Sequence, residues 1–127
     1  MTRYQGLLLD TDILIDYLRN RPEAVTYLDS LDEDLEISVI TAAELYAGVR
    51  EGAERAKLDT FLLAFVVIPL DSAIAVRGGL LRRDYGKSHG MGLADALIAA
   101  TALVRQVQLV SLNRKHFPML PDIRTPY

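Results

Sequence analysis

Residues 7–19 read LLLDTDILIDYLR, a short apolar run that stops at an aspartate and passes into an amphipathic stretch. The run from Gly6 to Leu9 predicts a short buried strand. The spacing of apolar residues from Asp12 to Arg19 predicts a helix. Asp10 therefore lies at the carboxyl end of a strand and directly before a helix.

The same alternation of short apolar runs and longer helical stretches continues along the chain. Further strands are expected at 37–40, 66–70 and 109–112, with a short fifth at 123–125. Helices are expected from Pro22 and over 41–50, 54–65 and 93–106. Another helix is expected to begin after a cap at Asp71 or Ser72, to bend at Gly78–Gly79 and to end before a loop over 86–92. Strands that alternate with helices predict an α/β fold: three layers, with a mostly parallel sheet of four to five strands flanked by helices.

Length and composition narrow the class of protein. The chain has 127 residues, half of them hydrophobic, which predicts a single domain spanning 1–127 with one real core. It has no cysteine, so disulfides and zinc–thiolate sites are excluded, and a cytoplasmic location is expected. No stretch is long and apolar enough to predict a membrane span. A net charge of −3 argues against binding nucleic acid through a general basic face, but a nuclease whose carboxylates hold a cation stays possible.

Three acids stand in apolar surroundings that predict burial: Asp10, Glu44 and Asp95. A buried carboxylate is unfavourable unless it is paired, hydrogen-bonded or coordinated to a metal. Three such residues, far apart in the chain, suggest one shared site. Hard cations such as Mg²⁺ or Mn²⁺ prefer oxygen ligands, and their usual work is to activate water and stabilise charge on a phosphoryl group.

Each acid also has a structural explanation. Asp10 could cap the helix that follows it, and Thr41-Ala-Ala-Glu44 matches the capping box. Asp95 lies in the first turn of an apolar helix, where the dipole contributes only about 0.3–1 kcal/mol, less than an unpaired buried charge costs. Asp12 and Asp16 share one helix face, and Arg19 is the expected partner of Asp16.

Three blocks in order resemble the PIN-domain ribonucleases, and within them the VapC-type toxins of toxin–antitoxin pairs. They are LLLDTDILIDYLR at 7–19, ISVITAAELYAGV at 37–49 and GLADALIAATALVRQVQLVSLNRKHF at 92–117. The resemblance implies Mg²⁺- or Mn²⁺-dependent hydrolysis of RNA phosphodiester bonds. It places Asp10, Glu44 and Asp95 on the family's acidic positions, as ligands of one cation that activates a water.

The chain also departs from the family pattern. Asp12 stands where the family usually has Asn, and the family's fourth acidic position is Asn113. His116 replaces an acid often found before Phe117, so the resemblance implies that a second metal binds weakly. Ser111 matches a family Ser/Thr and could orient a water or ligand, or could simply be a hydrogen-bonded strand hydroxyl.

The implied partners are RNA, a cognate antitoxin that blocks the acidic pocket with a cationic side chain, and a second copy of the chain in a homodimer. Because the chain is acidic, contacts with RNA phosphates must be local. The candidates, which flank Asp95 and Ser111 in sequence, are Arg82, Arg83, Lys87, Arg114 and Lys115, with Arg77, His89 and His116 beside them.

Two other functions compete with a ribonuclease. Asp10-Thr11-Asp12 after an apolar strand resembles the nucleophile motif of HAD-type phosphatases, but the late acidic pair of that chemistry is missing. The alternative that is not an enzyme is a catalytically weak PIN-like scaffold that acts mainly by binding a partner. Asn113 and His116 in place of acids give that alternative some weight.

Overall fold

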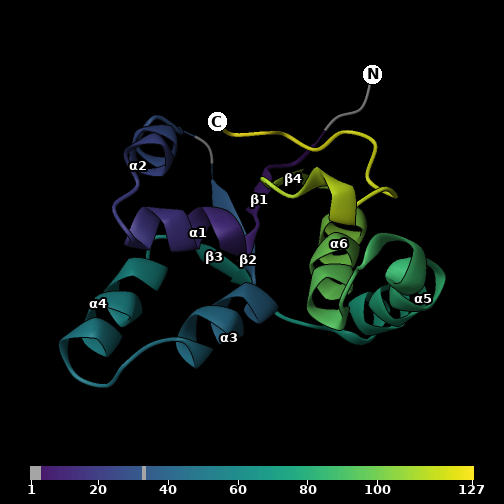
Figure 1. The fold of residues 1–127 in the computed structure, drawn as a ribbon, viewed down its shortest axis with the longest axis horizontal. Helices are drawn as coiled ribbons and strands as arrows, with labels where there is room; N and C mark the ends of the chain where they lie inside the picture. The colour runs from purple at the N-terminus through teal and green to yellow at the C-terminus, as the bar shows by residue number, and fades with distance from the viewer. Residues whose placement is uncertain (1–3, 33) are drawn as a thin grey trace.

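The computed structural model describes residues 4–32 and 34–127, and its centre is one parallel sheet of four strands (Figure 1). The strands are β1 (Leu7–Leu9), β2 (Leu35–Ser38), β3 (Val66–Ile68) and β4 (Gln108–Val110). Their order in the sheet is β3-β2-β1-β4, and every neighbouring pair is parallel. The predicted α/β class is confirmed. The short strand expected at 123–125 is reduced to a single bridge between Val110 and Arg124.

Within the described residues, six α-helices and one short 3₁₀-helix connect and cover these strands (Figure 1). They are α1 (Thr11–Leu18), α2 (Pro22–Asp29), α3 (Val39–Ala47), α4 (Ala53–Leu62), α5 (Ser72–His89), α6 (Leu93–Arg105) and η1 (Arg114–His116). None of the α-helices in the described ranges combines the length and the apolar character that crossing a membrane requires.

The strands present alternate side chains to two separate apolar clusters, as the two-residue period of a strand requires. Leu8 and Leu109 contribute to one cluster, together with side chains of α5 and α6. Leu7, Leu9 and Val110 contribute to the other, with side chains of α1, α2, α3 and α4. The sheet is therefore the middle of three layers, as predicted.

Several helix boundaries differ from the predicted ones, and two of them have a clear structural cause. The strand expected to run to Ile40 ends at Ser38, whose side chain accepts a hydrogen bond from the Ile40 backbone N–H at 3.0 Å and caps α3. The loop expected from residue 86 begins only after His89, because α5 continues to that residue and Gly90 then takes the left-handed φ of 64° that ends it.

The glycine pair inside α5 serves packing and does not break the helix. α5 runs without interruption through Gly78 and Gly79. A Cβ atom at Gly78 would lie 2.5 Å from Leu97 Cδ2 and 3.2 Å from Leu97 Cα. The absence of a side chain at Gly78 therefore permits the close approach of α5 to α6 (Figure 1).

Candidate active site

The carboxyl ends of the adjacent strands β1 and β4 bring Asp10 and Ser111 into contact. Asp10 follows β1, and its backbone N–H donates to the Val110 carbonyl at 2.9 Å. One oxygen of its carboxylate, Oδ1, accepts from the Thr11 N–H at 2.8 Å, and the other, Oδ2, accepts from the Ser111 hydroxyl at 2.7 Å. Asp10 is thus the N-cap of α1, which confirms the structural explanation offered for this acid. Its second oxygen faces the end of β4.

Burial raises the pKa of Asp10 to about 7. The nearby charges of Asp12 and, to a smaller extent, Asp95 contribute to this raised pKa. The hydrogen bonds from Ser111 and Thr11 act in the opposite direction and stabilise the ionised form. With only 5% of its surface exposed, Asp10 is a carboxylate that a bound cation would stabilise strongly.

Asp12 leaves one carboxylate oxygen without a hydrogen bond. Its Oδ2 accepts from the Leu112 backbone N–H at 3.2 Å, whereas its buried Oδ1 has no hydrogen-bond partner among the described residues. Burial is the main cause that raises the pKa of Asp12, and the charges of Asp16 and Asp95 contribute. The unpartnered oxygen is the kind of group that a cation or a water completes.

Glu44 reaches the same region from α3, although it is exposed and not buried as predicted. The Thr11 hydroxyl donates to Glu44 Oε1 at 2.7 Å and lies 3.0 Å from the Thr41 hydroxyl. The capping box expected for Thr41 and Glu44 is wrong, because Ser38 caps α3 and Thr41 lies inside the helix.

Asp95 lies in the first turn of α6 and is paired with a histidine. Its Oδ2 is 3.3 Å from His116 Nδ1, which is also 3.3 Å from Asn113 Nδ2. Its side chain is 32% exposed, so the predicted deep burial is wrong for this residue too. His116 thus lies against Asp95 as an imidazole that carries positive charge only when protonated.

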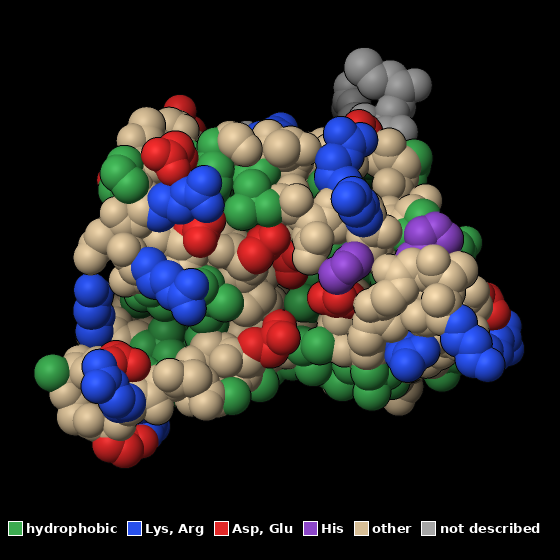
Figure 2. Space-filling view, in the orientation of Figure 1, with side chains coloured by type: hydrophobic (Ala, Val, Ile, Leu, Met, Phe, Trp, Pro, Cys, Tyr) green, Lys and Arg blue, Asp and Glu red, His purple; other side chains and the backbone are tan. Residues whose placement is uncertain are grey.

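Figure 2 shows the acidic side chains gathered on one face, with a histidine against one of them. The charges of Asp12 and Asp95 raise the pKa of Asp10, and Thr11 links Asp10 to Glu44. In the described part of the chain, no three Asp, Glu or His side chains form a closed metal-binding cluster. The arrangement is an open group of carboxylates and not a complete ligand cage.

The five basic candidates fall into two groups. Arg114 and Lys115 belong to η1, which begins immediately after Asn113, and both are exposed. Arg82, Arg83 and Lys87 lie on exposed positions of α5, where Arg83 Nε pairs with Asp84 Oδ1 at 2.8 Å. Figure 2 shows basic side chains on both sides of the acidic group.

Asp16 has a different partner from the one predicted. Arg21 Nη1 lies 3.1 Å from Asp16 Oδ2, and the Tyr127 hydroxyl donates to the same oxygen at 2.7 Å. The expected partner Arg19 is not the residue in contact. Asp16 is therefore satisfied by side chains outside the acidic group, which agrees with the structural role expected for it.

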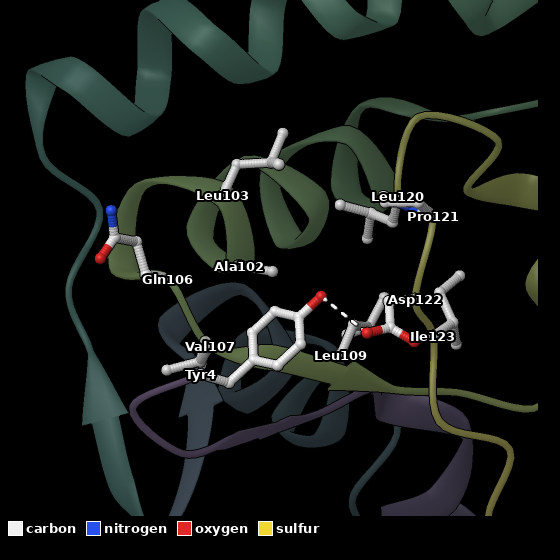
Figure 3. A pocket seen from close by; sticks show the side chains of 10 residues that line it. All are labelled: Tyr4, Ala102, Leu103, Gln106, Val107, Leu109, Leu120, Pro121, Asp122 and Ile123. Carbon is white, nitrogen blue, oxygen red and sulfur yellow. Dashed lines mark hydrogen bonds between the residues drawn. The ribbon is translucent and has the colours of Figure 1, made fainter. Parts of the chain in front are cut away.

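Two pockets lie near these elements, and they differ in their relation to the acids. A pocket of about 470 Å³ between α1, α3 and α4 has Glu44, Arg19 and Lys57 among its lining residues. A pocket of about 350 Å³ between α6, β4 and the C-terminal segment is mostly apolar (Figure 3). Its Tyr4 hydroxyl donates to Asp122 Oδ2 at 3.3 Å, and none of the predicted site residues lines it.

Known proteins share both the sequence and the fold. The PIN domain family matches residues 7–120. Ribonuclease VapC19 of Mycobacterium tuberculosis is 44% identical over 124 residues, covering 94% of this chain and 98% of the relative. Ribonuclease VapC10 of the same organism is also 44% identical over 124 residues, covering 95% and 92%.

Solved structures agree with this match. A toxin–antitoxin complex from Klebsiella pneumoniae superposes with a TM-score of 0.83 at 33% identity and covers 96% of this chain and 98% of that one. DNA-bound VapBC from Salmonella typhimurium superposes with a TM-score of 0.78 at 27% identity, covering 94% and 95%. The chain therefore belongs to the PIN-domain family, in its group of VapC ribonucleases. The resemblance and the PIN-like fold are confirmed, and the HAD-type phosphatase family is not the one to which the chain belongs.

Sequence reasoning missed Thr11 and Thr41 as neighbours of the acids. Thr11 stands between Asp10 and Asp12, so its position in the motif was a signal. Thr41 is a full helical turn before Glu44 and gave a misleading signal, because the pair matches a capping box. The contact between the two threonines depends on how α1 and α3 pack, which spacing along the chain does not reveal.

Proposed function

We propose that this chain is a metal-dependent endoribonuclease, the toxin of a type II toxin–antitoxin pair, which hydrolyses RNA phosphodiester bonds. The observation that carries the proposal is the buried Asp10 carboxylate, with a pKa near 7 and Asp12 as its acidic neighbour. Such a group is unfavourable in the ion-free protein and favourable around a cation.

The residues fit a divalent cation with oxygen ligands. Mg²⁺ usually keeps several waters and takes one or two carboxylates plus substrate phosphate oxygens, so a closed cage is not required. Asp10, Glu44 and Asp95 would hold the ion, and Asp12 offers its unpartnered Oδ1. When bound, Mg²⁺ or Mn²⁺ would lower the pKa of a water molecule and stabilise negative charge on the phosphoryl group.

The other residues of the site hold these acids in place or face the substrate. The Ser111 hydroxyl fixes Asp10 Oδ2, and the Thr11 N–H fixes Asp10 Oδ1. Arg114 and Lys115 on η1 would contact phosphates of the RNA beside the acids, which suits a chain whose net charge is −3. The basic residues of α5 would extend that contact.

The proposed protein partners are an antitoxin and a second copy of the chain. The pocket of about 470 Å³ that includes Glu44 suits an apolar segment with a cationic side chain directed at the acids. Exposed apolar side chains, among them Leu63, Val66 and Val76, leave apolar surface that supports the proposal of a homodimer. A cytoplasmic location is part of the same proposal.

The test is cleavage of a panel of RNAs by the purified protein in Mg²⁺ or Mn²⁺, with chelator added to one arm. We expect cleavage that chelation abolishes and that Asp95→Asn lowers by about 100-fold. Asp29→Asn at the end of α2 is the matched control, because Asp29 is an exposed acid that contacts none of the proposed site residues, and this variant should retain full activity. Absence of cleavage in both ions would favour the scaffold alternative, and release of phosphate from phosphomonoesters would favour a phosphatase.

A further inference from the structure

Thr11 is in contact with two of the candidate carboxylates at once. Its backbone N–H donates to Asp10 Oδ1 at 2.8 Å, and its hydroxyl donates to Glu44 Oε1 at 2.7 Å. Asp10 follows β1, while Glu44 lies on α3, 33 positions from Thr11. One residue at the start of α1 therefore joins acids from two separate elements.

The direction of the hydrogen bonds follows from counting protons. The Thr11 hydroxyl carries one proton and has two oxygen neighbours, Glu44 Oε1 and Thr41 Oγ1. An ionised Glu44 can only accept, so the proton of Thr11 goes to Glu44. The hydroxyl of Thr41, which is fully buried, then donates to Thr11. Two hydroxyls thus form a short chain that ends on the carboxylate.

Glu44 depends on this chain for its orientation. It is exposed, its side chain has several rotatable bonds, and Thr11 is its hydrogen-bond partner among the described residues. Holding such a side chain in one conformation costs rotamer entropy, which a short bond to a fixed donor offsets. Thr11 and Thr41 are both buried, so the donor itself is held by packing.

We propose that Thr11, supported by Thr41, is a positioning residue that sets the Glu44 carboxylate beside Asp10 and thereby determines how tightly the acidic group binds a divalent cation. The inference rests on the proposed function, because it assigns Thr11 a role at that site. The competing explanation is structural: the two hydroxyls would only fasten α1 to α3. A structural role predicts lost stability with unchanged affinity for the ion.

The experiment compares Thr11→Val, which keeps the shape and removes the hydroxyl, with Thr11→Ser, which keeps the hydroxyl. Calorimetric titration of the full chain with Mn²⁺ measures affinity, and melting temperatures in chelator measure stability. We expect Thr11→Val to weaken Mn²⁺ binding by about 10-fold and Thr11→Ser to remain close to wild type. With RNA, Thr11→Val should lower kcat and leave KM nearly unchanged.

A second pair of variants separates the outcomes. In the Glu44→Gln background, Thr11→Val should have no additional effect on Mn²⁺ affinity, because its acceptor charge is already gone. Thr41→Val should also weaken Mn²⁺ binding, but less than Thr11→Val does. If Thr11→Val does not fold, Thr41→Val tests the proposal in its place. Wild-type Mn²⁺ affinity in a folded Thr11→Val or Thr41→Val, with Glu44→Gln impaired, would overturn this inference alone. Absence of Mn²⁺ binding by the wild-type protein would overturn the proposed function and this inference with it.

Discussion

The Ser111 hydroxyl donates to the Asp10 carboxylate at 2.7 Å, although 101 positions separate the two residues along the chain. The same hydroxyl oxygen accepts from the Asn113 backbone N–H at 2.9 Å. Ser111 itself is completely buried. This one side chain connects the ends of β1 and β4 and fixes the most buried acid among the described residues.

Replacing Ser111 by Ala should destabilise the protein and raise the pKa of Asp10 further. The change removes the hydrogen bond that favours the ionised carboxylate and leaves the Asn113 N–H unpaired. We expect a loss of about 1–3 kcal/mol in the free energy of unfolding, measured by urea denaturation. Ser30→Ala is the control, since that hydroxyl is exposed, and it should change stability by less than about 0.5 kcal/mol. Equal losses of stability in Ser111→Ala and Ser30→Ala would contradict this role of the Ser111 hydroxyl.

Asp10→Asn should make the ion-free protein more stable at neutral and alkaline pH while abolishing activity. The folded pKa of Asp10 is about 7 and its ordinary value is 3.8, so between these values the folded state binds the proton more tightly. Stability therefore falls as pH rises through this window, and the ionised carboxylate costs at most about 4 kcal/mol above it.

The measurement is the melting temperature of wild type and Asp10→Asn in chelator from pH 4 to pH 8. The variant should melt several degrees higher at pH 8, and the difference should disappear toward pH 4. A difference that stays constant with pH would show that Asp10 does not titrate in this range.

Asn113→Asp should strengthen binding of Mn²⁺, because it adds a carboxylate next to the acids. Asn113 is exposed, and its side chain lies 3.3 Å from His116, so the new charge can be accommodated. We expect an affinity gain on the order of tenfold by calorimetry. Asn20→Asp adds the same charge at an exposed position beyond α1 and should have little effect. Unchanged or weaker Mn²⁺ binding by Asn113→Asp would count against the prediction that Asn113, at the family's fourth acidic position, weakens binding of the ion.

The two neighbouring glycines of α5 should respond in opposite ways to alanine. Gly78→Ala brings a methyl group against Leu97, including its Cα at 3.2 Å, so a change of side-chain rotamer alone cannot relieve the contact. We expect a loss of about 1–3 kcal/mol from overpacking. Gly79→Ala meets nothing within 4 Å and should gain up to about 1 kcal/mol of helix stability. Denaturation curves of the two variants measure both changes in stability. A Gly79→Ala variant that is less stable than Gly78→Ala would contradict the close packing of Gly78 against Leu97.

The sheet and the position of Asp10 at its edge were predictable because strands leave strong local signals. The apolar run of β1 predicted that Asp10 directly follows a strand, whereas Ser111 was expected inside the strand at 109–112 and instead follows β4. The start of α3 was not predictable, because Val39 and Ile40 are β-branched and continue the pattern of a strand. Only the position of the Ser38 side chain fixes that boundary.

Burial of the acids was predictable for one of the three. Asp10 directly follows an interior strand and is enclosed by β4 and α1. Glu44 and Asp95 have apolar neighbours in sequence, but those neighbours cover other faces of α3 and α6. Apolar surroundings along a helix show that the helix is packed and do not show which face a given residue occupies.

The pairing of β1 with β4 has a consequence for the order in which the molecule is made. β1 is synthesised about a hundred residues before its neighbour β4 and the Ser111 hydroxyl. A growing chain that ends within α6 carries Asp10 and Glu44 but lacks the strand that encloses Asp10. The acidic centre is completed only after β4 has been made, so a synthesis product interrupted before β4 cannot hold Asp10 as this structure does.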